Sequence, residues 1–251
     1  MASIETSEED GVRYLHFGSH WVQGAMRIAR PWALELEYTR EMMMPLLLRA
    51  DQPDWPKSVL QVGLGAASIT KFLHRHHPEA KLTVVEITPA VVATARQSFK
   101  LPEDPGRLAI EIGDGREFMA AAAPRFDFIL IDGFDAKGRA GKLDSVPFYR
   151  DCMERLTRQG MLAVNLLDRR KGVAASVERI REVFAKRVLV LPAGEAGNTV
   201  VLAARGRAIG ESFDDLRSAA LRLKAETGLN LLPTLARLVH AQSAPAKRLV
   251  M

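Results

Sequence analysis

Residues 58–70 read SVLQVGLGAASIT, and this stretch decides how the rest of the chain is organised. A short apolar run leads into a turn that contains Gly63 and Gly65, and a helical pattern follows. This order is typical of a nucleotide-binding corner, because glycine lets the backbone approach a ligand and the helix start offers unpaired N–H groups. Many such corners carry glycines for packing only, so the turn alone does not assign a function.

The next unit strengthens the nucleotide interpretation. Residues 81–85 predict a second strand, which ends at Glu86, roughly 20 residues beyond the glycines. A carboxylate at this strand end is where the two hydroxyls of a ribose are held. The alternative is an acidic cap of the helix that begins near Pro89. The joint occurrence of the glycine corner and the acid favours the ribose interpretation.

Composition limits the classes of protein. The chain has 251 residues, 47% of them hydrophobic and 26% charged, which allows one large α/β domain with a small appendage. The formal net charge is +5, but the basic residues are scattered and aromatic residues are few, so we expect no nucleic-acid partner. No apolar run reaches membrane-spanning length and the N-terminus is polar, so we expect no membrane partner and no targeting signal. The single cysteine, Cys152, fits a reducing compartment, and we expect a cytoplasmic protein.

From residue 58 to residue 203, apolar runs alternate with helical patterns, which predicts a mostly parallel α/β sheet with helices on both faces. The last two predicted strands lie too close together for a crossover helix, so we expect them to pair antiparallel. We divide the chain into a small N-terminal β-hairpin and helix region (1–50), a nucleoside-binding catalytic domain (51–210) and a C-terminal helical extension (211–251).

The flanking regions carry simpler expectations. Residues 11–30 contain three glycines and alternate loosely, which predicts one or two β-hairpins. Residues 31–48 predict a helix that Pro45 kinks, with three consecutive methionines as core filling. The C-terminal extension predicts two amphipathic helices that pack on the domain or on a second subunit, followed by a loose tail over residues 243–251.

Three histidines, His74, His76 and His77, stand close together in the sequence and raise the question of a metal site. They lie at the expected C-terminus of a helix, where cationic side chains are favoured by the helix dipole. Nothing nearby in the sequence completes a set of ligands, so we expect no metal.

Four acids follow successive predicted strands: Glu86, Asp114, Asp132 and Asp135. In an open parallel sheet the carboxyl ends of the strands lie together at the ligand crevice. Each acid singly could be a turn former or a helix cap. Taken together, they suit a nucleoside that bears a positively charged group.

At this point the sequence resembles the polyamine aminopropyltransferases, the spermidine synthase family. The similar segments are VLQVGLGAAS, VVEITPAVV, EIGDGREF and FDFILIDGFD, which occur in the family's order across residues 55–165. The likeness extends upstream to Gln23 and Tyr38, and downstream to the stretch 143–149. The resemblance implies a Rossmann-like adenosylmethionine-dependent transferase fold and a homodimer.

The resemblance also implies roles for single residues. The donor, decarboxylated S-adenosylmethionine or S-adenosylmethionine, would be bound by Gly63, Gly65, Glu86, Ile87, Asp114, Gly115 and Asp132. The amine acceptor, such as putrescine, would be bound by Gln23, Tyr38 and Asp135. Asp132 and Asp135 would be catalytic, because carboxylates attract an alkylammonium ion (pKa about 10), orient it and accept its proton.

The sequence also departs from the family pattern. The family's glycine corner usually carries an acid where this chain has Ala66, and Thr88 replaces another acid. An expected histidine and a second substrate tyrosine are absent. These departures keep two alternatives open: a methyltransferase or aminocarboxypropyl transferase that uses intact S-adenosylmethionine, and a non-catalytic nucleoside-binding homologue. The pair of glycines together with Glu86 leaves a third, a nicotinamide-dependent reductase, although Asp114, Asp132 and Asp135 have no role in hydride transfer.

Overall fold

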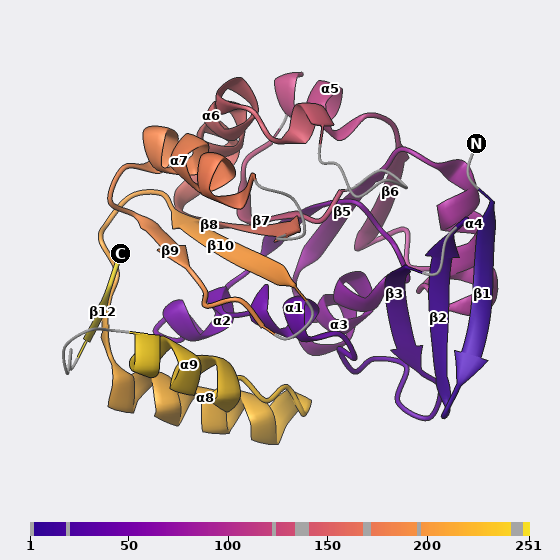
Figure 1. Cartoon of the computed structure of the whole chain (residues 1–251), viewed down its shortest axis with the longest axis horizontal. Coiled ribbons are helices and arrows are strands. Elements are labelled where there is room, and N and C mark those ends of the chain that lie inside the picture. Colours follow the sequence, from indigo (N-terminus) through magenta and orange to yellow (C-terminus); the bar gives the residue numbers. More distant parts are fainter. Residues whose placement is uncertain are drawn as a thin grey trace.

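A computed structural model describes residues 3–18, 21–121, 124–133, 141–167, 172–194, 197–241 and 248–251 (Figure 1). In this part of the chain the main element is a seven-stranded sheet with the order β6-β5-β4-β7-β8-β10-β9. Its strands are β4 (Ser58–Val62), β5 (Lys81–Glu86), β6 (Leu108–Ile112), β7 (Phe126–Ile131), β8 (Leu156–Leu167), β9 (Val188–Val190) and β10 (Asn198–Ala204).

The sheet is mostly parallel, as the alternation of strands and helices predicts. Strands β6, β5, β4, β7 and β8 pair parallel, whereas β10 pairs antiparallel with both β8 and β9. The expected antiparallel closing pair is therefore confirmed. Strand β4 lies between β5 and β7. The strands that follow β4 first extend the sheet on one side, as β5 and β6, and then on the other side, as β7 and β8. A ligand crevice is expected outside the carboxyl ends of the strands at such a switch point.

Helices cover both faces of this sheet. One face packs against α3 (Ser68–His76) and α4 (Pro89–Ser98), and the other against α5 (Gly115–Ala120), α6 (Val146–Arg155) and α7 (Val173–Phe184). Alternate residues of β4 and β7 join the two core clusters, as expected for strands buried on both faces. The fold is the Rossmann-like α/β fold that the sequence predicts.

A separate antiparallel sheet precedes the central one. It consists of β1 (Ile4–Glu9), β2 (Val12–Phe17) and β3 (Val22–Arg27), so the expected hairpins exist and one further strand precedes them. This sheet lies beside α4 in Figure 1. The Ser68 hydroxyl donates a hydrogen bond of 2.9 Å to the Ala25 carbonyl, which ties β3 to the start of α3.

The prediction of one kinked helix over residues 31–48 is wrong. Two short helices form instead, α1 (Glu37–Glu41) and α2 (Pro45–Leu48). Pro45 begins α2, because its fixed φ suits a first helical turn and its missing N–H costs nothing there. The intervening Met42, Met43 and Met44 are fully buried, which confirms the interpretation of core filling.

The C-terminal hairpin, which we define as α8 (Phe213–Thr227) and α9 (Leu232–Ala241), packs on the main domain. Leu216 and Ala220 of α8 and Leu235 and Leu238 of α9 join the same buried cluster as α2 and α3. The expected loose tail is wrong for residues 248–251, because β12 (Arg248–Val250) pairs with β11 (Gly210–Ser212). Apolar burial explains this order, since Leu249 and Met251 are both buried. No helix in the described ranges is long and apolar enough to cross a membrane.

Candidate active site

The glycine corner brings β4 close to the tip of β7. Gly63 adopts φ +91° and Gly65 adopts φ +52°, the left-handed region that favours glycine. A side chain on Gly63 would collide with the backbone carbonyl of Asp132. The Asp132 N–H in turn donates a hydrogen bond of 2.9 Å to the Val62 carbonyl. The corner therefore fixes the backbone of Asp132 as well as its own.

Glu86 lies at the end of β5, against the same corner. Its Oε2 accepts a hydrogen bond of 2.9 Å from the Leu64 N–H, and its Oε1 accepts one of 2.9 Å from the Thr88 N–H. Thr88 is the N-cap residue of α4, so Glu86 fixes the turn before that helix, but no side chain caps the helix itself. Each carboxylate oxygen has a second lone pair, which leaves acceptor capacity for ribose hydroxyls. Burial raises the pKa of Glu86, and the backbone hydrogen bonds oppose that shift.

Asp114 lies at the end of β6 and caps α5. Its Oδ1 accepts a hydrogen bond of 2.7 Å from the Arg116 N–H, so the helix-cap alternative is correct for one of its two oxygens. A side chain on Gly115 would overlap Val62, which means that α5 begins directly against β4. Ile87, which follows Glu86, is 66% exposed, and Ile112 at the end of β6 is 52% exposed. Two apolar side chains thus stand beside two acids at the strand ends.

Asp132, at the tip of β7, accepts hydrogen bonds on both of its carboxylate oxygens. Its Oδ2 accepts a hydrogen bond of 3.1 Å from the Tyr38 hydroxyl, and its Oδ1 accepts one of 2.8 Å from the Asn165 amide. The Asn198 side-chain amide donates a hydrogen bond of 2.9 Å to the side-chain oxygen of Asn165, and this contact turns the Asn165 N–H₂ group toward Asp132. Both carboxylate oxygens are therefore held in place, and the side-chain orientation is fixed.

Burial raises the pKa of Asp132 to about 6, and the nearby charge of Glu86 raises it as well. The hydrogen bonds from Asn165 and Tyr38 act in the opposite direction, because they stabilise the ionised form. Burial, together with the Asp132 carboxylate, raises the pKa of Tyr38 well above its usual value, so its hydroxyl stays a donor. Asp132 can therefore exchange a proton near neutral pH, which suits a general base.

Strand β3 covers the glycine corner from the side of the small sheet. The Gln23 carbonyl lies beside Gly65, where a side chain on that glycine would be 3.3 Å away. A side chain on Gly24 would come within 2.6 Å of the Ala66 Cβ. Ala66 is buried with Leu15 and Met26 of the small sheet. Position 66 therefore faces the small sheet, with its Cβ close to Gly24.

The structure describes all of the predicted site residues except one. The structure brings Gly63, Gly65, Glu86, Asp132 and Tyr38 together around the switch point, with Gln23 beside the glycine corner. Asp135 lies outside the described residues. Leu143, which ends a short 3-10 helix (Gly141–Leu143), contacts the positions where side chains on Gly115 and Gly133 would be, so it closes over the strand ends.

Sequence reasoning missed Leu143, Asn165 and Asn198 as members of this site. Asn165 and Asn198 are polar residues near the ends of otherwise apolar strands, and both face the crevice end of the sheet. A buried amide in an apolar run is a detectable signal, since it needs a partner. The partner itself could not be identified without the strand order.

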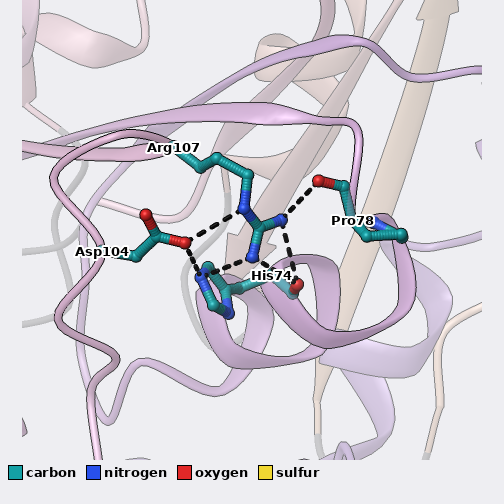
Figure 2. A network of polar contacts seen from close by, with 4 residues as sticks. All are labelled: His74, Pro78, Asp104 and Arg107. Atoms are coloured by element: carbon teal, nitrogen blue, oxygen red, sulfur yellow. Dashed lines mark hydrogen bonds and ion pairs between the residues drawn. The ribbon is translucent and has the colours of Figure 1, made fainter.

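The histidines at the end of α3 have separate surroundings. His74 joins a network with Asp104, Arg107 and the Pro78 carbonyl, which Figure 2 shows. Asp104 Oδ2 lies 3.0 Å from both His74 Nε2 and Arg107 Nε. The rings of His76 and Phe72 contact each other in a tilted arrangement, with their centroids 4.8 Å apart. Burial lowers the pKa of His77 to about 4. Within the described ranges, no group of three or more His, Cys, Asp or Glu side chains is placed to hold a metal ion.

Comparison with known proteins adds independent findings. A sequence model of the spermine/spermidine synthase domain matches residues 36–183. The polyamine aminopropyltransferase of Chromobacterium violaceum is 34% identical over 251 residues, covering 100% of this chain and 95% of the relative. A probable spermidine synthase from Corynebacterium glutamicum has a similar structure, with a TM-score of 0.74, 20% identity, and coverage of 88% of this chain and 83% of that one. Human methyltransferase-like protein 13, solved in complex with SAH, gives a TM-score of 0.67 and 22% identity, with coverage of 77% of this chain and 93% of that one.

Proposed function

Because the chain belongs to the spermine/spermidine synthase family, we propose that it transfers an aminopropyl group from decarboxylated S-adenosylmethionine to an amine such as putrescine. One observation carries this proposal beyond family membership. The Asp132 carboxylate is oriented by Tyr38 and Asn165 and lies on the glycine corner that also holds Glu86. We call Glu86 and the glycine corner the nucleoside half of the site, and the surroundings of Tyr38 the amine half. The two halves meet at Asp132.

The donor would bind through the strand ends. Glu86 accepts hydrogen bonds from the two ribose hydroxyls, and Gly63 and Gly65 let the backbone approach the nucleoside. Asp114 accepts a hydrogen bond from the adenine amino group, beside Gly115. Ile87 supplies an apolar wall for the adenine ring, as its high exposure at the end of β5 supports.

The amine would bind on the side of Tyr38, with Gln23 and Asp135 as further contacts. In the reaction, the amine nitrogen attacks the methylene carbon next to the sulfonium. A C–N bond forms, the C–S bond breaks, and its electron pair goes to sulfur, which becomes a neutral thioether. Only the neutral amine has a lone pair for this attack, so the substrate ammonium group first gives one proton to the Asp132 carboxylate, whose pKa of about 6 suits that transfer. The attack then leaves a secondary ammonium ion as the product, and the positive charge of the sulfonium is lost with the C–S bond.

An S-adenosylmethionine-dependent methyltransferase or aminocarboxypropyl transferase is the second candidate. Ala66 favours it, because an acid at this corner would repel a donor that carries its own carboxylate, and this chain has no acid there. The same nucleoside contacts would serve either donor.

Calorimetric titration with decarboxylated and with intact S-adenosylmethionine, side by side, tests the proposal. We expect tighter binding of the decarboxylated donor, followed by an aminopropyl adduct of an amine in mass spectrometry of the products. Tighter binding of the intact donor would favour the second candidate. Binding of neither would contradict both, and binding without turnover on any amine would support a non-catalytic nucleoside-binding homologue.

The proposal includes three broader expectations. The division of the chain at residues 50 and 210 is supported by the separate small sheet and the C-terminal hairpin. A cytoplasmic location is supported by the single cysteine, Cys152, which is buried and whose pKa burial raises. A homodimer is expected from the family resemblance, and light scattering during size-exclusion chromatography tests it.

A further inference from the structure

Tyr38 reaches the site from a helix that is too short to hold its own position. Helix α1 has five residues, and Leu36 before it provides no side-chain cap. Isolated helices of this length are not stable in water, because nucleation is unfavourable. Contacts from elsewhere must therefore keep α1, and with it the Tyr38 hydroxyl, in register with Asp132.

Arg237 of α9 provides such contacts at both ends of α1. Its Nη1 lies 2.9 Å from Glu37 Oε1, and its Nη2 forms an ion pair and hydrogen bond with Glu41 Oε1. The Glu41 side chain is only 2% exposed and the Arg237 side chain 30% exposed, so the pair is buried on the side of Glu41. Glu37 and Glu41 are four residues apart and share one face of the helix, and Tyr38 follows Glu37 directly.

Glu37 also packs against the segment that leads into β10. A side chain on Gly194 would overlap the Glu37 carboxylate, so helix and segment are in direct contact. Four residues later, Asn198 begins the relay through Asn165 to Asp132. Helix α1, which carries Tyr38, therefore packs against the segment just before β10, the strand that begins with Asn198.

The ion pairs are not needed to dock the C-terminal hairpin. Four apolar residues of the hairpin already join the main core, and such burial provides most of the docking energy. A buried ion pair adds little net stability, because desolvation offsets its attraction, and its best-attested use is to fix one arrangement. The placement of Arg237 thus points to orientation of α1.

We propose that Arg237 is a positioning residue for the amine half of the site, which holds α1 so that the Tyr38 hydroxyl meets Asp132. As far as turnover is concerned, this inference rests on the proposed aminopropyl transfer. It assigns a role in the reaction to the C-terminal hairpin, about 100 residues along the chain from Asp132 and far from the donor motifs.

The test compares four proteins: wild type, Arg237→Met, the double variant E41Q/R237M and the control Arg217→Met. The double variant removes the buried charge that the single variant leaves unpaired, and Arg217 is an exposed arginine on α8 of the same hairpin. Kinetics give kcat, and calorimetry without amine gives the dissociation constant of the donor. We expect both Arg237 variants to lose at least tenfold in kcat with donor affinity within about twofold of wild type, and the control to match wild type.

A second measurement does not depend on turnover. The chain has three tyrosines, so labelling their ring carbon Cζ with ¹³C gives a simple NMR spectrum in which Tyr38→Phe identifies the Tyr38 resonance. This resonance reports the hydrogen bond to Asp132. We expect it to shift in both Arg237 variants, well below their melting temperatures, and to stay unchanged in Arg217→Met.

The outcomes separate the two proposals. An unchanged Tyr38 resonance together with unchanged kcat in the double variant would overturn the positioning role while leaving aminopropyl transfer intact. If the wild type turned over no donor and amine pair, the proposed function would fail, and the Tyr38 resonance alone would then decide whether Arg237 positions α1.

Discussion

The Tyr38 hydroxyl donates a hydrogen bond of 3.1 Å to Asp132 Oδ2, and this contact joins two segments that are 94 residues apart in the chain. Tyr38 comes from a short helix outside the central sheet, whereas Asp132 stands at the tip of β7. The acid proposed to accept the proton is thus tuned by a residue that lies outside the nucleoside-binding strands.

The first prediction concerns this hydrogen bond. In Tyr38→Phe the Asp132 carboxylate loses one of its two donors, so its pKa, already raised to about 6 by burial, should rise further. Because the proposed base must be ionised, the acidic limb of the kcat/KM profile should move to higher pH by about one unit. A profile from about pH 5 to about pH 9 measures this shift. Tyr14→Phe, on β2, is the matched control, and an unmoved limb in Tyr38→Phe would contradict the assignment.

The second prediction concerns Asp132 itself. Asp132→Asn should lower kcat by about 10²- to 10⁴-fold, because the proton acceptor is lost. Donor affinity should fall far less than kcat, because Asp132 is only one of the proposed donor contacts and Glu86 and the glycine corner remain. Stopped-time product assays and calorimetry measure the two effects separately. The exposed Asp54 provides the control variant Asp54→Asn, and full turnover by Asp132→Asn would show that another group takes the proton.

The strand ends could be predicted from the sequence because each follows an apolar run directly. Gly63, Glu86 and Asp132 each follow a parallel strand, and the carboxyl ends of parallel strands lie at the same edge of the sheet, so the three residues meet at the switch point. Asn165 and Asn198 could not be assigned, because their relay depends on β10 pairing antiparallel with β8. Arg237 was hidden for a similar reason, since it reaches α1 across 196 residues of sequence.

The third prediction concerns Lys71 on α3, which is fully buried and donates a hydrogen bond of 2.8 Å to the Phe99 carbonyl. Burial lowers its pKa from 10.5 to about 7, and the charge of Lys100 lowers it as well. Between these two values the unfolded chain binds the proton and the folded chain does not. Stability should therefore rise with pH across that window, by up to about 1.4 kcal/mol per pH unit.

Lys71→Met removes this dependence. The variant should be more stable than wild type near pH 6, by about 1–3 kcal/mol, because an unpaired buried charge is replaced by an apolar side chain of similar length. Its advantage should vanish as the pH approaches 10. Urea denaturation at several pH values measures the difference, with Lys224→Met on the exposed side of α8 as control. Parallel curves for Lys71→Met and wild type would refute the lowered pKa.

The fourth prediction concerns the contact between the small sheet and the glycine corner. In Gly24→Ala the new methyl group would come within 2.6 Å of Ala66 Cβ and 2.9 Å of the Ala66 nitrogen, so backbone must move. We expect a loss of about 1–3 kcal/mol in stability and weaker donor binding. Gly113→Ala, where nothing lies within 4 Å of the added carbon, should change neither. Unaltered donor affinity in Gly24→Ala would show that β3 does not support the corner.

The nucleoside half and the amine half of the proposed site come from different secondary-structure elements, and this has a consequence for protein engineering. Most of the proposed donor contacts come from the ends of β4, β5 and β6, whereas the side chains that bind Asp132 come from α1, β8 and β10. A combinatorial library restricted to Tyr38, Asn165 and Asn198 can therefore explore new acceptor amines while donor recognition stays intact. Gly63 should be left out of any such library, since a side chain there would displace the Asp132 backbone and alter both substrates at once.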